Sequence, residues 1–390
     1  MKINVSSFKG VGAISLASLV GAGVAFLVNV ISARALGPEY RGEVAFVLQL
    51  SYVLAPIVGL GADRLILRAS SSGGIKEGLG GSRTYSVSVA ALLGGVLFLS
   101  FGPEAMLAAP AALVSAAFQI QRSRAIAAGS EARFLVLFAL YQFSILAGTI
   151  VLAAVGAELW ILWVMVYVIP GLSVVAVSFR ETGQRRPRLL EALEAWPFTV
   201  AAISQMLVLR SERLLLPALA GPSSLGVYVV VATATEPLLW IAQALADTRA
   251  SRERRVLRWR AVLAGLFRDA LTFGIVAALG GVALYHLIEP VFGIQYADGK
   301  ELVVPLCLAG VALVSYRQSA GIALGHLSKR ALGVVETAVA LIAFTIYASA
   351  ISRYAIIGAA WASVFVYLFA CIVLLLSVRF FGVRDEGLDK

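Results

Sequence analysis

The chain has 390 residues, of which 60% are hydrophobic and only 14% are charged, and its mean hydropathy is +0.90. A soluble domain of this length carries roughly 25% charged residues, most of them on its surface. The shortage of charge therefore excludes an ordinary soluble protein and indicates that much of the surface faces lipid. The formal net charge of +10 points either to an anionic partner or to an uneven distribution of charge across a membrane.

Apolar runs of about twenty residues recur along the chain, and each is long enough to cross a hydrocarbon core ~30 Å thick as an α-helix. Lipid offers backbone groups no hydrogen-bond partner, so such spans must be helical. We therefore predict an all-α, polytopic membrane protein with about twelve transmembrane helices. Their expected bounds are 11–33, 44–66, 85–102, 106–120, 134–155, 159–179, 198–220, 225–247, 269–289, 303–323, 335–351 and 356–378. The first run follows Lys2 and Lys9 but is too long for a signal peptide, so we interpret it as an uncleaved span.

Lysine and arginine are distributed unevenly over the segments between these spans. If the N-terminus is cytoplasmic, the outer segments hold only Arg34, Arg41, Lys300 and Arg353 of the 32 basic residues, and the cytoplasmic segments hold 25, among them Arg64 and Arg122. Short cytoplasmic segments are enriched in Lys and Arg, so we expect both termini on the cytoplasmic side. The basic residues are spread over separate short loops, and the net charge therefore indicates topology rather than nucleic-acid binding.

The most basic of these segments is 249–268, which carries seven arginines together with apolar residues at helical spacing, among them Trp259 and Phe267. Two interpretations are open. The segment is either an amphipathic helix that lies on the membrane surface and attracts anionic lipid, or an ordinary basic loop ahead of the ninth span.

The two halves of the chain resemble each other at equivalent places. The motif G-P-x-x-x-G occurs at 37–42 after the first span and at 221–226 after the seventh, and segment 127–133 matches 323–329. Six spans in each half give both halves one orientation, so we predict two six-helix lobes, 1–188 and 189–390, related by a pseudo-two-fold axis along the membrane normal. Two facing bundles of this kind are typical of alternating-access transporters.

The same segments carry a family resemblance. Residues 31–42 are similar to the opening motif of the bacterial polysaccharide (O-antigen, Wzx-type) flippases of the multidrug/oligosaccharidyl-lipid/polysaccharide (MOP) exporter superfamily. Further similarities lie at Gly59-Leu60-Gly61 with Arg68, at 292–297, at 323–330 and at 353–360, where Ala355 stands in place of the usual glycine. The resemblance implies a twelve-helix, two-lobe transporter in the bacterial cytoplasmic membrane. It would move an oligosaccharide on undecaprenyl pyrophosphate to the outer leaflet through a cationic cavity, and work with proteins of cell-surface polysaccharide assembly.

Ionisable residues lie inside the seventh and tenth predicted spans. Arg210, Glu212 and Arg213 are near the middle of the seventh, and Arg317 is in the tenth. Because a charge at the bilayer centre costs at least ~2.5 kcal/mol, these side chains should face a partner or a wet cavity. The functional hypothesis is that Arg210, Arg213 and Arg317 bind a pyrophosphate through bidentate hydrogen bonds. The alternative is that the arginines pair with Glu212 or Glu236 and only hold helices together.

Two further charged residues have open roles. Glu236, in the eighth span at a similar depth to Arg210, is either the partner of an arginine or a protonatable coupling group. Arg34, at the outer mouth, either guides the substrate or anchors its span at the interface. His286 and His326 are far apart in the chain, so we expect neither a metal site nor a cofactor.

Three functions remain to be compared. A flippase for lipid-linked oligosaccharides fits the span arginines, whereas a cation-coupled drug exporter of the same superfamily should have an acidic cavity. A membrane polysaccharide polymerase needs a sizeable outer loop or paired catalytic carboxylates. The outer loops are short, so we predict a transporter and not an enzyme.

Overall fold

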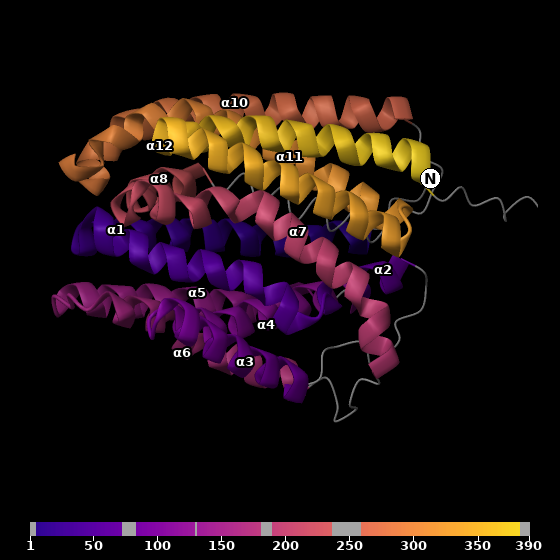
Figure 1. The fold of residues 1–390 in the computed structure, drawn as a ribbon, viewed down its shortest axis with the longest axis horizontal. Helices are drawn as coiled ribbons and strands as arrows, with labels where there is room; N and C mark the ends of the chain where they lie inside the picture. Colours follow the sequence, from indigo (N-terminus) through magenta and orange to yellow (C-terminus); the bar gives the residue numbers. More distant parts are fainter. Residues whose placement is uncertain (1–4, 72–82, 129–130, 181–188, 236–258, 383–390) are drawn as a thin grey trace, which may run out of the picture.

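The computed structural model describes residues 5–71, 83–128, 131–180, 189–235 and 259–382 (Figure 1). Within these ranges the chain is almost entirely helical and contains no strand. The helices are α1 (Val5–Gly59), α2 (Ala62–Ser71), α3 (Arg83–Phe101), α4 (Ala108–Ala128), α5 (Glu131–Ala154), α6 (Trp160–Arg180), α7 (Leu189–Ala220), α8 (Pro222–Thr235), α10 (Trp259–Phe292), α11 (Val303–His326) and α12 (Lys329–Phe381). Two short 3₁₀ helices, η1 (Ala105–Leu107) and η2 (Ile294–Leu302), connect α3 to α4 and α10 to α11.

The two longest helices are each a pair of antiparallel spans joined by a tight reversal. In α1 the backbone leaves helical geometry at Gly37, with φ 70°, and Arg41 Nη2 then lies 2.9 Å from Asn29 Oδ1. In a straight helix, twelve residues would separate these two side chains by ~18 Å along the axis. In α12 the reversal is at Ala355. The predicted pairs of spans on either side of Gly37-Pro38 and of residues 352–355 are therefore confirmed.

Helix ends differ from the prediction in several places. Among them, α4 continues to Ala128 instead of ending at 120, and α7 begins at Leu189 instead of 198. The predicted span 44–66 is wrong at its end, because α1 stops at Gly59 and α2 begins at Ala62 after Leu60 and Gly61, which both have positive φ. The basic segment 249–268 is not wholly a loop or a surface helix, because α10 already begins at Trp259. Residues 249–258 lie outside the described part of the chain.

The helices form two groups that meet along α1, α7 and α8 (Figure 1). In the first lobe, α1 packs on α4 and α5, and α4 packs on α3 and α6. In the second lobe, α12 packs on α7 and α11, and α11 packs on α10. Five described segments are long and apolar enough to cross a membrane, in α1, α5, α6, α10 and α12. The protein is thus an all-α, multi-pass membrane protein, while the predicted boundary at 188/189 falls against residues that are not described.

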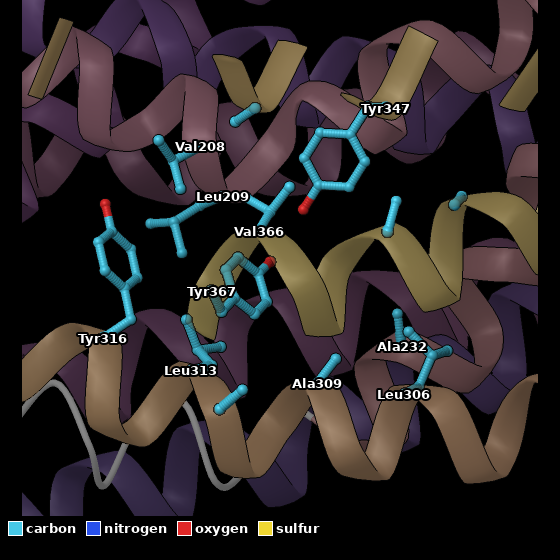
Figure 2. Close-up of a cluster of buried hydrophobic side chains, with 14 of the residues drawn as sticks. Val208, Leu209, Ala232, Leu306, Ala309, Leu313, Tyr316, Tyr347, Val366 and Tyr367 are labelled. Atoms are coloured by element: carbon cyan, nitrogen blue, oxygen red, sulfur yellow. The ribbon is translucent and has the colours of Figure 1, made fainter. Parts of the chain in front are cut away.

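The core of the second lobe lies where α7, α11 and α12 meet. Figure 2 shows Leu313 and Tyr316 of α11 facing Val208 and Leu209 of α7, with Tyr367 of α12 beside them. The rings of Tyr316 and Tyr367 are stacked, with centroids 6.1 Å apart and planes at 2°. This packing embeds α7 in protein rather than in lipid, so the charged middle of α7 is held between the lobes.

The two G-P-x-x-x-G motifs contact each other across the lobe interface. A Cβ on Gly42 would lie 2.0 Å from the carbonyl oxygen of Pro222, and a Cβ on Gly226 would lie 1.9 Å from that of Pro38. The contact is reciprocal, as expected where a two-fold axis passes between two copies of one motif. Glycine is required at both positions because each backbone touches the backbone of the other lobe.

Candidate functional site

A cavity of about 340 Å³ lies between the two lobes. The first lobe lines it with one face each of α1, α4 and α5 and with parts of α2 and α6, and the second lobe lines it with parts of α7, α8 and α11. Its charged lining residues among the described part of the chain are six arginines and one aspartate. They are Arg41, Arg64, Arg122, Arg210, Arg213, Arg317 and Asp63.

Arg64 and Arg317 approach each other from opposite lobes at one end of this cavity. Arg64 Nη2 of α2 donates to Gln205 Oε1 of α7 at 2.6 Å, and Arg317 Nη1 of α11 donates to the same oxygen at 3.1 Å. Both arginines are 7% exposed. Glu336 of α12, 1% exposed, is an acidic group that interacts electrostatically with both. The neutral glutamine oxygen and the buried carboxylate therefore hold two like charges close together.

Arg41 is held at the other end of the cavity by a second inter-lobe contact. Its Nη2 donates to Asn29 Oδ1 at 2.9 Å, and Asn29 Nδ2 donates to the carbonyl oxygen of Val230 in α8 at 3.0 Å. Nearby, the Tyr296 hydroxyl donates to the carbonyl oxygen of Ala33 at 3.0 Å. Burial raises the pKa of Tyr296, although the neighbouring Arg41 opposes this shift, so the phenol remains a donor at neutral pH.

The three charges of α7 have different surroundings. Arg210, half-buried, lies over the ring of Tyr52 in α1 at 5.2 Å from the centroid, a distance at which cation–π attraction operates. Arg213 Nε lies 3.3 Å from Glu212 Oε1. Glu212, 1% exposed, faces a separate cavity of about 40 Å³ inside the second lobe rather than the central one. Arg213 therefore pairs with an acid and also lines the cavity, and its binding of a pyrophosphate stays a prediction.

The structure places the remaining predicted site residues outside the cavity lining or outside the described residues. Arg34 Nε and Nη2 donate to the carbonyl oxygens of Val291 and Pro290, at 2.7 and 2.6 Å. It thus ties α1 to the last turn of α10, where carbonyls lack helical partners, and it is not among the lining residues. Glu236 lies in the range 236–258, which is not described.

Three cavity arginines lie in segments that the charge distribution predicts to be outside the spans. The sequence places Arg41 in the outer segment after the first span and Arg64 and Arg122 in cytoplasmic segments, whereas each lies on a helix and lines the cavity. Arg124, two residues beyond Arg122, instead donates to the carbonyl oxygen of Ser178 in α6 at 3.1 Å. The available signal was helical spacing, because Ser115, Gln119 and Arg122 recur on one polar face of α4.

Comparison with known proteins identifies the fold. No protein-family model and no curated protein matches the chain. Among solved structures, a MOP superfamily transporter from Pyrococcus furiosus matches with a TM-score of 0.61 and 16% identity, covering 95% of each chain. That protein is described as having a binding pocket of reverse polarity that suggests a different function. The chain has the fold of these transporters.

Two further structures of this fold show that the match extends over the whole architecture. An outward-facing multidrug-resistance MATE transporter of the MOP superfamily matches with a TM-score of 0.59 and 16% identity, covering 95% of this chain and 94% of that one. A MATE protein in complex with MaD3S matches with a TM-score of 0.60 and 16% identity, covering 95% of both chains. At this identity the likeness to the MOP fold concerns architecture, and the cargo must be argued from the cavity itself.

Proposed function

We propose that the protein is a flippase that moves a polyprenyl-pyrophosphate-linked oligosaccharide from the cytoplasmic to the outer leaflet of a bacterial membrane by alternating access. The observation that carries the proposal is the charge of the cavity, where the described lining has six arginines and one aspartate. A pyrophosphate bears several negative charges, and guanidinium groups bind phosphate oxygens through paired, charge-assisted hydrogen bonds. The cationic lining supports an anionic cargo.

The lobe contacts support a mechanism that opens one end at a time. The Gly42–Pro222 and Gly226–Pro38 contacts close one end. At the other end the backbone of Gly61 touches that of Thr199, where a Cβ would lie 2.8 Å from the amide nitrogen. Residues 42 and 61 are ~28 Å apart along a helix, close to the ~30 Å thickness of the hydrocarbon core. Release of one contact while the other stays closed would expose the cavity to one side of the membrane.

Substrate binding would couple to closure through the arginines of both lobes. Arg41 and Arg64 come from the first lobe, and Arg210, Arg213 and Arg317 come from the second. Like charges on facing walls repel each other, and a bound pyrophosphate would convert this repulsion into attraction to a common anion. In this mechanism both termini are cytoplasmic, and the product is delivered to outer-leaflet proteins of polysaccharide assembly.

The alternative in the same fold is a cation-coupled drug exporter. It would be favoured by carboxylates in the cavity. The two buried carboxylates of the described second lobe, Glu212 and Glu336, are not among the central lining residues. Asp63 is the acidic side chain found there among the described residues. A cationic drug would therefore meet a repulsive lining.

The test is leaflet-to-leaflet movement of a fluorescent polyprenyl-pyrophosphate oligosaccharide in proteoliposomes. Arg210→Gln and Arg317→Gln should each slow movement roughly 10- to 100-fold, because a hydrogen bond to a charged group contributes about 1.5–3 kcal/mol. Arg353→Gln, at an exposed arginine away from the cavity, is the matched control and should leave the rate unchanged. Export of a cationic dye on an ion gradient, without movement of the anionic lipid, would replace the flippase by the drug exporter.

A further inference from the structure

The aromatic lining of the central cavity belongs entirely to the first lobe. Described cavity residues with aromatic rings come from α1, α4, α5 and α6, and none comes from α7, α8 or α11. They are Tyr52, Phe118, Phe134, Phe138, Tyr141 and Tyr167. The second lobe lines the same space with arginines, Gln205 and small or aliphatic residues. The two walls therefore offer different chemistry to one ligand.

Four of these rings form one continuous surface. Phe134 and Phe138, one turn apart on α5, are stacked with centroids 5.6 Å apart. Phe118 of α4 meets Phe138 edge-on at 6.0 Å and meets Tyr141 at 4.4 Å. These contacts fix the rings against one another, and Phe118 remains half-buried at the cavity surface. A rigid aromatic surface of this kind presents an apolar platform without the entropy cost of ordering flexible side chains.

Polar side chains of the first lobe line the same cavity as this platform. Gln119 and Arg122 lie on the same face of α4 as Phe118, and Gln142 lies next to Tyr141 on α5. Gln49 of α1 is 5% exposed, and its Oε1 has no hydrogen-bond partner among the described residues. A buried amide oxygen without a partner is costly, so its position on the cavity wall indicates a ligand with hydrogen-bond donors. Planar amides and guanidinium groups can each pair with two adjacent hydroxyl groups.

A ring with an apolar face and a rim of hydroxyl groups fits this combination, and that is the chemistry of a sugar. We propose that the aromatic wall of the first lobe, centred on Phe118 with Gln49, Gln119, Arg122 and Gln142 around it, is a saccharide-binding subsite of the cavity. This inference rests on the proposed function, because it assigns the pyrophosphate to the arginines between the lobes and the adjoining sugar to the first lobe.

The size of the cavity limits how much of the substrate this subsite holds. About 340 Å³ is near the lower end of the ~300–1,000 Å³ typical of small-molecule pockets. It accommodates a pyrophosphate and the sugar attached to it, but not a long oligosaccharide or the polyprenyl chain. Selectivity should therefore depend on the sugar next to the pyrophosphate more than on distal sugars.

The experiment compares two short probes that differ only in the sugar. Full-length protein in detergent is titrated calorimetrically with farnesyl pyrophosphate and with farnesyl pyrophosphate carrying a disaccharide. Phe118→Leu keeps an apolar side chain but removes the ring. It should weaken binding of the sugar-bearing probe roughly three- to tenfold while leaving the sugar-free probe nearly unchanged. Phe118→Tyr retains a ring and should restore most of the difference.

Two controls separate recognition from folding. Phe143→Leu lies on α5 at a side chain that is 54% exposed and does not line the cavity, and it should affect neither probe. Gln119→Ala removes a hydrogen-bonding amide without touching the ring cluster, and it should weaken only the sugar-bearing probe even if Phe118→Leu folds poorly. Arg210→Gln should weaken both probes.

The outcomes distinguish this inference from the proposed function. If wild-type protein binds both probes equally, or if Phe118→Leu and Gln119→Ala weaken both by the same factor, the saccharide subsite is refuted while the anionic-lipid function stands. If the wild-type protein binds neither probe, the proposed function fails and the subsite fails with it.

Discussion

Replacement of Gly226 by alanine tests whether the contact between the two G-P-x-x-x-G motifs holds the lobes together at one end. The new Cβ would lie 1.9 Å from the carbonyl oxygen and 2.7 Å from the carbonyl carbon of Pro38. Both atoms belong to the backbone of the other lobe, so no side-chain rotation relieves the clash. The lobes must instead separate at this end by about 1 Å or more.

The size of the effect follows from the cost of overpacking. Extra methyl groups in a tightly packed interface typically cost about 1–3 kcal/mol. Here the cost applies only to conformations in which this end is closed, so it appears as a shift between conformations rather than as loss of folding. A difference of this size changes the ratio of open to closed populations about 5- to 150-fold. Gly42→Ala should act in the same way through Pro222.

The assay is a distance distribution between spin labels on the two lobes. Glu104→Cys in the first lobe and Ile294→Cys in the second are exposed, in a background in which Cys307 and Cys371 are replaced. The distribution should broaden towards longer distances in Gly226→Ala. Gly23→Ala is the control, because a Cβ there would meet nothing within 4 Å.

The reasoning would be refuted if Gly226→Ala gave the wild-type distance distribution and an unchanged melting temperature. The interface would then absorb a methyl group locally, and the reciprocal contact would not restrain opening. A lower melting temperature without a change in distances would mean that the clash destabilises the whole fold instead of one conformation.

Three further predictions follow from individual contacts. Ala355→Gly should raise the unfolding free energy by about 1 kcal/mol in a thermal melt, because φ 47° and ψ −128° strain a residue with a Cβ. Ala348→Gly, within the helix, is the control and should lower the unfolding free energy by a similar amount. Asn29→Ala should lower the free energy of unfolding by about 1–3 kcal/mol, because it removes the hydrogen-bond acceptor of Arg41 and the donor to the Val230 carbonyl. Asn29→Gln, which keeps an amide donor and acceptor, is compared with it by denaturation. Arg34→Ala should change the free energy of unfolding by less than about 1 kcal/mol and leave the affinity for both probes unchanged, since the described contacts of Arg34 are with backbone carbonyls. A clear loss of affinity in the calorimetric titration would instead give Arg34 a role in guiding the substrate.

The helices were predictable because a chain in lipid can adopt few kinds of secondary structure. A backbone without water must satisfy its own hydrogen bonds, so runs of apolar residues give the spans directly. The reversals at Gly37 and Gly221 were visible for a similar reason, because glycine before proline is a strong turn signal. Ala355 shows the limit of that rule. It occupies a backbone conformation that favours glycine, and the turn was indicated by the break between the predicted spans 335–351 and 356–378 and by the family-like pattern, without a glycine.

Much of the site could not be predicted from the sequence, because arginine is the residue type that marks cytoplasmic loops and also the one that binds an anionic ligand. The rule that places Lys and Arg in cytoplasmic loops assigned Arg64 and Arg122 to loops, and an arginine near the end of a span has no sequence feature that separates the two roles. Only tertiary packing separates the two roles. Arg64 lies at the lobe interface because α2 begins directly after Gly61, whose backbone touches that of Thr199. That contact joins segments more than 130 residues apart in the chain.

The symmetry of the backbone and the asymmetry of the cavity have different physical origins. The repeat preserves glycine where the two lobes touch, because a side chain at Gly42 or Gly226 would meet the backbone of the other lobe. The cavity walls have no such constraint, and they differ, with rings on α4 and α5 facing arginines on α7 and α11. The paired motifs and the Gly61–Thr199 contact lie at opposite ends, so one end would open while the other stays closed. A substrate with an anionic part and a neutral ring would place the ring against the first lobe, because all the aromatic rings of the described lining lie there. Such a substrate would therefore keep its sugar on the first lobe and its pyrophosphate between the arginines of both lobes as the lobes move.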